Sequence, residues 1–129
     1  INDESISSII NDMNWVENEF LPTVQQRGKA VIDARGASSA TSAAKAALDT
    51  VMACENATDV NNSFSAAVES DGSYGVPEGL ICGFPLIADS DGNVTIKQGL
   101  ELSEFAKQKF QVSIDELSSE REAVKHLMK

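Results

Sequence analysis

Two helical patterns separated by a short polar break occupy residues 23–47, and this arrangement most constrains what the chain can fold into. Val24, Val31 and Ala34 recur at helical spacing, and a second apolar series resumes from Ala40 to Met52. Between the two series lies the sequence RGASS, which carries no apolar side chain larger than alanine. We therefore expect two consecutive helices. The residues of their connection are expected to face the part of the protein that lies beyond the two helices.

The limits of these helices follow from capping and breaking residues. The first pattern predicts a helix from about Met13 to Arg35, which Pro22 either kinks or restarts. The second helix is expected to begin near Ser38, whose hydroxyl is a plausible N-cap, and to fray in the polar run 55–59. A short amphipathic pattern also covers residues from Asp3 to Ile10.

The middle third of the chain changes from helical periodicity to alternation. Residues from Phe64 to Glu69 alternate as in a strand, and residues 70–77 are dense in turn formers. Residues 80–88 are mostly apolar, residues 89–93 form a turn signal, and Val94 to Lys97 alternate again. This pattern predicts a β-hairpin within a small antiparallel sheet.

A long helix is predicted to close the chain, with Ser103 as a candidate N-cap. Its apolar positions follow roughly helical spacing: Leu102, Phe105, Phe110, Ile114, Leu117, Val124 and Leu127. The order of helices, strands and a final helix contains no alternating βαβ units. The predicted fold class is therefore α+β, as one domain over residues 1–129.

Composition excludes several classes of function. The formal net charge is −10, with 20 acidic and 10 basic residues, and the basic residues are scattered, so nucleic acid is not an expected partner. No segment approaches the roughly 20 apolar residues of a membrane span. Cys54 and Cys82 lack CxxC spacing, which favours a reduced cytosolic setting. The N-terminus INDESISSII lacks the features of a signal peptide and reads like a chain entered midway through a longer protein.

Few residues offer catalytic or metal-binding chemistry. The sequence has no glycine-rich phosphate loop. Its single histidine, His126, is interpreted as a solvated residue at a helix end, and Cys82 as a small core residue. The spacing in Asp89-Ser90-Asp91-Gly92-Asn93 resembles part of a calcium loop, but the downstream glutamate is missing, so a hairpin turn is the favoured interpretation. We expect no metal site.

The cluster Ser38, Ser39 and Ser42 is the best candidate for a functional site. Helix capping and close packing of small residues explain it from local pattern, whereas the hydroxyls could also line a pocket shared with another domain. Gln25, Gln26 and Arg27 could contact a subunit or ligand, although a solvated helix face explains them as well.

Four motifs occur in an order that resembles the C-terminal half of NAD-dependent malate dehydrogenases of the cytosolic type, within the malate/lactate dehydrogenase family. They are TVQQRGKAVI at 23–32, SSATSAAKA at 38–46, SDGSYGVP at 70–77 followed by Phe84-Pro85, and GLELSEF at 99–105. The resemblance covers nearly the whole chain, from about Trp15 to its end.

The resemblance implies a C-terminal, substrate-side domain in which long helices pack on a twisted antiparallel sheet. It implies that the Rossmann domain, the mobile loop and the catalytic histidine and aspartate lie upstream, so that no catalytic residue is in this chain and the fragment alone is inactive. It implies a cytoplasmic, homodimeric enzyme of the tricarboxylic acid cycle that acts with NAD on a small dicarboxylic or 2-hydroxy acid. Ser38, Ser39 and Ser42 match the pocket edge, and the helix around Gln25, Gln26 and Arg27 is implied to make dimer or domain contacts.

Two alternatives remain open at this stage. The intact enzyme could be a lactate dehydrogenase, because substrate choice in this family depends on the upstream loop. In a different class of function, the chain could be a stand-alone dimerisation or interaction module that binds a partner through residues 25–45.

Overall fold

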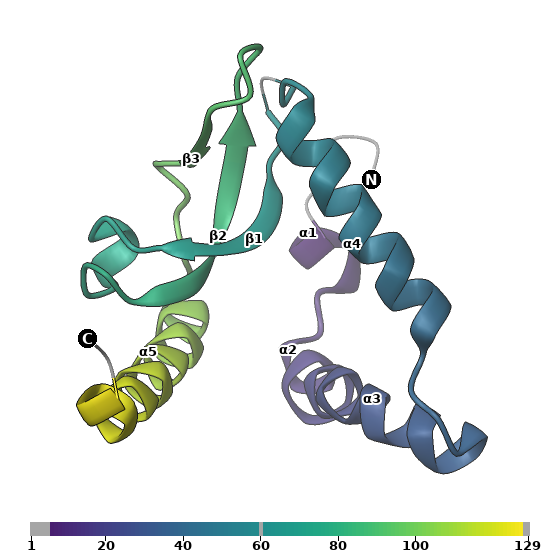
Figure 1. Ribbon diagram of the computed structural model, residues 1–129. Coiled ribbons are helices and arrows are strands. Elements are labelled where there is room, and N and C mark those ends of the chain that lie inside the picture. The colour runs from purple at the N-terminus through teal and green to yellow at the C-terminus, as the bar shows by residue number, and fades with distance from the viewer. Residues whose placement is uncertain (1–5, 60, 128–129) are drawn as a thin grey trace. The chain divides into compact units, whose positions relative to one another are not determined.

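The computed structural model describes residues 6–59 and 61–127 of the chain (Figure 1). The chain divides into two compact units, one ending at Lys45 and the other beginning at Ala46. In the first unit, helix α1 covers Ile6–Ile10. The part of the expected amphipathic pattern that precedes Ile6 lies outside the described residues.

A continuous helical path follows in the first unit, as the sequence predicts. It consists of helix α2 (Met13–Trp15), a π-helical turn (Val16–Phe20) and helix α3 (Leu21–Arg35). Pro22 lies in the first turn of α3, directly after the π-helical turn, so the backbone N–H that proline lacks falls where the helical hydrogen-bond pattern changes. The proline therefore restarts the helix directly after the π-helical turn and does not break it.

The break between the two predicted helices is real, but the second helix begins later than expected. Gly36 ends α3 in the left-handed conformation with φ 71°, and its N–H donates to the carbonyl of Ile32 at 2.7 Å. Helix α4 covers Ala40–Glu55, so Ser39 and not Ser38 is the residue directly before the helix.

The second unit contains a three-stranded antiparallel sheet, with the strand order β1-β2-β3. Strands β1 (Phe64–Glu69), β2 (Ile81–Ala88) and β3 (Val94–Ile96) lie where the alternating patterns predict them. Ala66 is opposite Phe84 and Leu86 is opposite Ile96. The predicted hairpin is therefore confirmed, and it is formed by β2 and β3.

The core of the second unit lies between the sheet and the last helix. Cys82, Phe84 and Leu86 alternate along β2 and are buried, and Ile114 of helix α5 (Glu104–Val124) joins them. Figure 1 shows α5 beside the sheet in this unit. The interpretation of Cys82 as a core residue is confirmed, whereas Cys54 is only half-buried.

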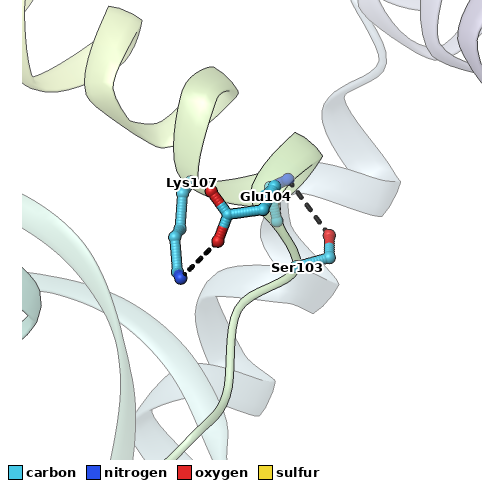
Figure 2. Close-up of polar contacts among 4 residues, drawn as sticks. Ser103, Glu104 and Lys107 are labelled. Carbon is cyan, nitrogen blue, oxygen red and sulfur yellow. Dashed lines mark hydrogen bonds and ion pairs between the residues drawn. The ribbon is translucent and has the colours of Figure 1, made fainter.

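The start of α5 is capped as the sequence predicts. The Ser103 hydroxyl accepts the backbone N–H of Ala106 at 3.2 Å, and Lys107 Nζ pairs with Glu104 Oε1 at 2.7 Å (Figure 2). The hydroxyl satisfies one of the four N–H groups that a helix start leaves without an intrahelical partner. At the other end of α5, a 3₁₀ turn (Lys125–Leu127) carries His126, which is exposed as expected.

The turn-rich segment between β1 and β2 is a tight loop organised by Ser70. Its hydroxyl donates to the carbonyl of Val76 at 3.0 Å and accepts the N–H of Gly72 at 3.1 Å. Tyr74 lies in this loop with a positive φ of 55°, a conformation that is uncommon for a residue with a side chain. Its hydroxyl donates to the carbonyl of Lys97, which ties the loop to the segment after β3.

The turn between β2 and β3 is closed by the carboxylate of Asp89. Its oxygens accept the N–H groups of Asp91 and Asn93, both at 2.9 Å, and the side-chain amide of Asn93 at 2.8 Å. The hydrogen bonds from Asn93, together with the neighbouring backbone N–H groups, lower the pKa of Asp89 below its ordinary value. The hairpin-turn interpretation of this acidic segment is therefore confirmed.

This arrangement predicts a pH dependence of stability. The charged form of Asp89 stabilises the folded chain at pH values above the ordinary aspartate pKa of about 3.9. That stabilisation is lost as the pH falls through the lowered pKa, because the protonated carboxyl loses its charge-assisted hydrogen bonds. In Asp89→Ala, acid titration followed by circular dichroism should give a shallower loss of stability below about pH 4, although Asp71, whose pKa is also lowered, still contributes. Asp91→Asn is the control in the same turn, and an equal change in this variant would contradict the assignment.

The described residues form an α+β fold with a small antiparallel sheet and helices, and they contain no dinucleotide-binding domain. The predicted fold class is correct. Within the described ranges, the structure has no helix that is both long and apolar enough to cross a membrane.

Candidate functional site

The three candidate serines lie together at the start of α4. Ser38 and Ser39 belong to the connection between α3 and α4, and Ser42 is the third residue of α4. All three are exposed. Ser39 directly precedes the helix, and Ser42 follows Ser39 by three residues. Both hydroxyls therefore lie at the N-terminal turn of the helix.

The start of α4 offers hydrogen-bond donors to a ligand. The first N–H groups of an α-helix have no intrahelical carbonyl to bond, and the helix dipole makes this end partly positive. Serine hydroxyls beside such N–H groups can both donate and accept hydrogen bonds. This chemistry fits a carboxylate or a carboxamide, which the serines would position without making or breaking bonds.

Gln25, Gln26 and Arg27 are exposed residues of α3. Arg27 precedes the end of the helix by eight residues, which corresponds to about 12 Å along the axis at the usual rise. These three residues lie on α3, whereas the serine cluster lies at the start of α4, so they are a separate candidate contact surface. Phe20, Val24 and Ile32 expose 45%, 54% and 47% of their surface in the same unit.

No further constellation for acid-base or metal chemistry lies within residues 6–59 and 61–127. There, no group of three or more histidine, cysteine, aspartate or glutamate side chains could hold a metal ion. His126 is exposed at the end of α5. His126 is therefore part of no such group within the described residues.

The sequence patterns did not predict a cavity of about 420 Å³ that lies in the second unit. Its lining residues come from the loop after β1, from β2, from the segment before α5, and from α5 itself: Tyr74, Gly83, Phe84, Pro85, Leu100, Leu102, Ala106, Lys109, Phe110 and Ser113. No local spacing signals such a cavity, because tertiary packing brings these four segments together.

Comparison with known proteins gives a family for the whole chain. Residues 2–128 match the model of the α/β C-terminal domain of lactate/malate dehydrogenases. A malate dehydrogenase of Magnetococcus marinus is 49% identical over 128 residues, which are 99% of this chain and 39% of that protein. The chain thus spans well under half the length of this relative.

Solved structures of the same family share the fold. The crystal structure of malate dehydrogenase from Naegleria fowleri superposes with a TM-score of 0.83 at 38% identity, over 93% of this chain and 36% of that one. A Trichomonas vaginalis lactate dehydrogenase in complex with NADH and oxamate gives a TM-score of 0.79 at 26% identity, over 90% of this chain and 36% of that one. From the match over residues 2–128 and these likenesses it follows that the chain belongs to the lactate/malate dehydrogenase family, as its C-terminal domain.

Proposed function

We propose that this chain is the substrate-side domain of an NAD-dependent malate dehydrogenase, which interconverts L-malate and oxaloacetate when intact. The observation that carries the proposal is the 49% identity to a malate dehydrogenase over 99% of the chain. Identity to the lactate dehydrogenase structures is lower, at 25% and 26%. The family match across residues 2–128 also supports treating both compact units as parts of one domain over residues 1–129.

We assign a positioning role to Ser38, Ser39 and Ser42. Their hydroxyls, with the N–H groups at the start of α4, suit a carboxylate of the substrate or the carboxamide of the nicotinamide. NAD, when bound, accepts or supplies the hydride. The described residues contain no glycine-rich phosphate cradle, so the rest of the cofactor must be bound by other parts of the enzyme.

The residues of this chain do not supply the acid-base step in this proposal. His126 is the single histidine of the sequence and lies exposed at the end of α5. The chain alone is therefore expected to be inactive, and activity belongs to the longer protein. We further propose that this longer enzyme is of the cytosolic type, works in the cytoplasm in the tricarboxylic acid cycle, and forms a homodimer through the helix surface around Gln25, Gln26 and Arg27.

The decisive experiment compares substrates in the longer protein that contains this chain. NADH oxidation with oxaloacetate should be much faster than with pyruvate. A preference for pyruvate would instead favour the lactate dehydrogenase alternative. NADH oxidation with oxaloacetate by the purified 129-residue chain alone would disprove the proposal that the acid-base step and most of the cofactor binding belong to other parts of the enzyme.

A smaller effect is expected from Ser39→Ala in the longer enzyme. Losing one neutral hydrogen bond to substrate or cofactor should raise KM about two- to tenfold. Steady-state kinetics with each substrate varied in turn would show which ligand the hydroxyl contacts. Ser119→Ala, an exposed serine of α5, is the matched control. An equal rise of KM in this control, or none in Ser39→Ala, would remove Ser39 from the site.

A second candidate function, as an interaction module, has a specific observation in its favour. Val51 and Met52 follow Leu48 by three and four residues along α4, and the three side chains expose 58%, 55% and 60% of their surface. Such a stripe is typical of a helix face that packs on a partner. Light scattering of the chain together with the kinetic assay separates the two functions. The interaction module would be favoured if the chain forms a defined oligomer and the longer protein that contains it has no dehydrogenase activity.

A further inference from the structure

The cavity of about 420 Å³ in the second unit is lined mainly by apolar side chains. Phe84 is only 2% exposed, and its ring lies 6.5 Å from that of Tyr74, measured between centroids. Leu102 and Phe110 complete the apolar lining. The volume lies within the range of roughly 300–1,000 Å³ that small-molecule sites in proteins occupy.

Tyr74 is held in place as one wall of this cavity. Its hydroxyl donates to the carbonyl of Lys97 and lies 3.5 Å from the backbone nitrogen of Leu100. Its backbone adopts a positive φ of 55°, which costs free energy in a residue with a side chain. Because both the backbone and the hydroxyl are constrained, the ring is a preorganised surface that a ligand need not order.

The polar groups of the lining come from one face of α5. Ala106, Lys109, Phe110 and Ser113 follow each other at intervals of three, one and three residues, so that they share that face. Lys109 is the only charged residue among the described residues that line the cavity, and its Nζ lies 5.6 Å from the ring centre of Phe105. The lining therefore combines an aromatic interior with one cation and one hydroxyl donor.

We propose that this cavity binds a monocarboxylate that carries an aromatic or branched apolar group. The apolar group would occupy the space between Tyr74, Phe84 and Phe110, and the carboxylate would face Lys109 and Ser113. An amine would face the Lys109 charge unfavourably, whereas a carboxylate can form a charge-assisted hydrogen bond with it that a neutral compound cannot. An aromatic ring with a short acid chain combines the apolar and anionic groups that this lining can contact.

The chain contains its own reporters for a binding test. Tyr74 is its single tyrosine and lines the cavity, while Trp15 is its single tryptophan and belongs to the first unit. Titration with phenylpropionate, followed by NMR, should shift the ring signals of Tyr74 in a saturable way and leave those of Trp15 unchanged. Phenylpropionamide, which has the same apolar group without the charge, should bind more weakly.

Two variants separate the cation from the apolar space. Lys109→Gln should weaken phenylpropionate binding about two- to fivefold, as expected for an exposed ion pair, and leave the amide unaffected. Lys125→Gln, at the end of the same helix and outside the lining, is the matched control. Ala106→Leu should fill part of the cavity and reduce binding of both compounds.

The proposal is overturned if Tyr74 does not shift, if Trp15 shifts equally, or if acid and amide bind alike in both the parent chain and Lys109→Gln. Equal losses in Lys109→Gln and Lys125→Gln would mean that only the general charge of the chain matters. The Lys109→Gln comparison remains informative even if Ala106→Leu fails to fold, because Lys109 is exposed and its replacement disturbs no core residue.

Discussion

Replacement of Phe84 by alanine is expected to destabilise the second unit by about 3–5 kcal/mol, the largest effect of any single substitution proposed for this chain. The side chain is 2% exposed and lies in the core between β2 and α5. Its removal leaves a cavity and takes away the ring beside Tyr74. Since small domains are stable by only about 5–15 kcal/mol, such a loss removes a large share of the free energy of unfolding.

Denaturant unfolding followed by the near-ultraviolet signal of Tyr74 would measure this loss. Ile81→Ala is the matched control, because Ile81 belongs to the same strand and is 57% exposed. We expect a change well below that of Phe84→Ala, and Phe84→Leu should lie between the two. Similar losses in Phe84→Ala and Ile81→Ala would contradict the placement of the core on the Phe84 face of β2.

The second largest effect is expected from Ser70→Ala, at about 1–3 kcal/mol. Ser70 is 4% exposed, and its hydroxyl joins the carbonyl of Val76 to the N–H of Gly72. Alanine leaves the carbonyl of Val76, a residue that is 1% exposed, without this donor. A buried acceptor that loses its partner costs the desolvation free energy that the hydrogen bond had offset.

Hydrogen exchange distinguishes this loss from a general weakening of the fold. In Ser70→Ala, the amide of Gly72 should exchange faster because its acceptor is gone, and the free energy of unfolding should fall. Ser65→Ala replaces an exposed serine of β1 and should change stability by less than about 0.5 kcal/mol. Unchanged exchange at Gly72 in Ser70→Ala would show that the hydroxyl does not organise the loop.

Local patterns predicted the elements that local interactions define. The alternation along residues 64–69 and 94–96 gave the correct strands, since one face of this sheet packs on the core and the other is exposed. Ser103 was identified as a cap from its position before an apolar period, and its hydroxyl bonds the N–H of Ala106. In each case the contact lies within a few residues along the chain, so the sequence window contains both partners.

Local patterns failed where backbone geometry depends on a neighbouring segment. The start of α4 was expected near Ser38 and lies two residues later, at Ala40, because helix ends are defined less sharply by local pattern than helix interiors. The positive φ of Tyr74 could not be predicted, since its hydroxyl bonds a carbonyl 23 residues away. The pocket-edge role of Ser38, Ser39 and Ser42 stays a prediction, because the ligand that would test it requires other parts of the enzyme.

The sequence by itself determined the class of the fold, the order of its elements and, through four ordered motifs, the family. These properties depend on periodicity, turn residues and motif spacing, which are properties of short segments. Only the tertiary structure decided that Phe84 is buried against Ile114, that Ser70 organises the loop before β2, and that Lys109 stands beside an aromatic cavity. The physical reason is that burial and cavities arise where segments far apart in the chain pack together, and no single segment contains that information.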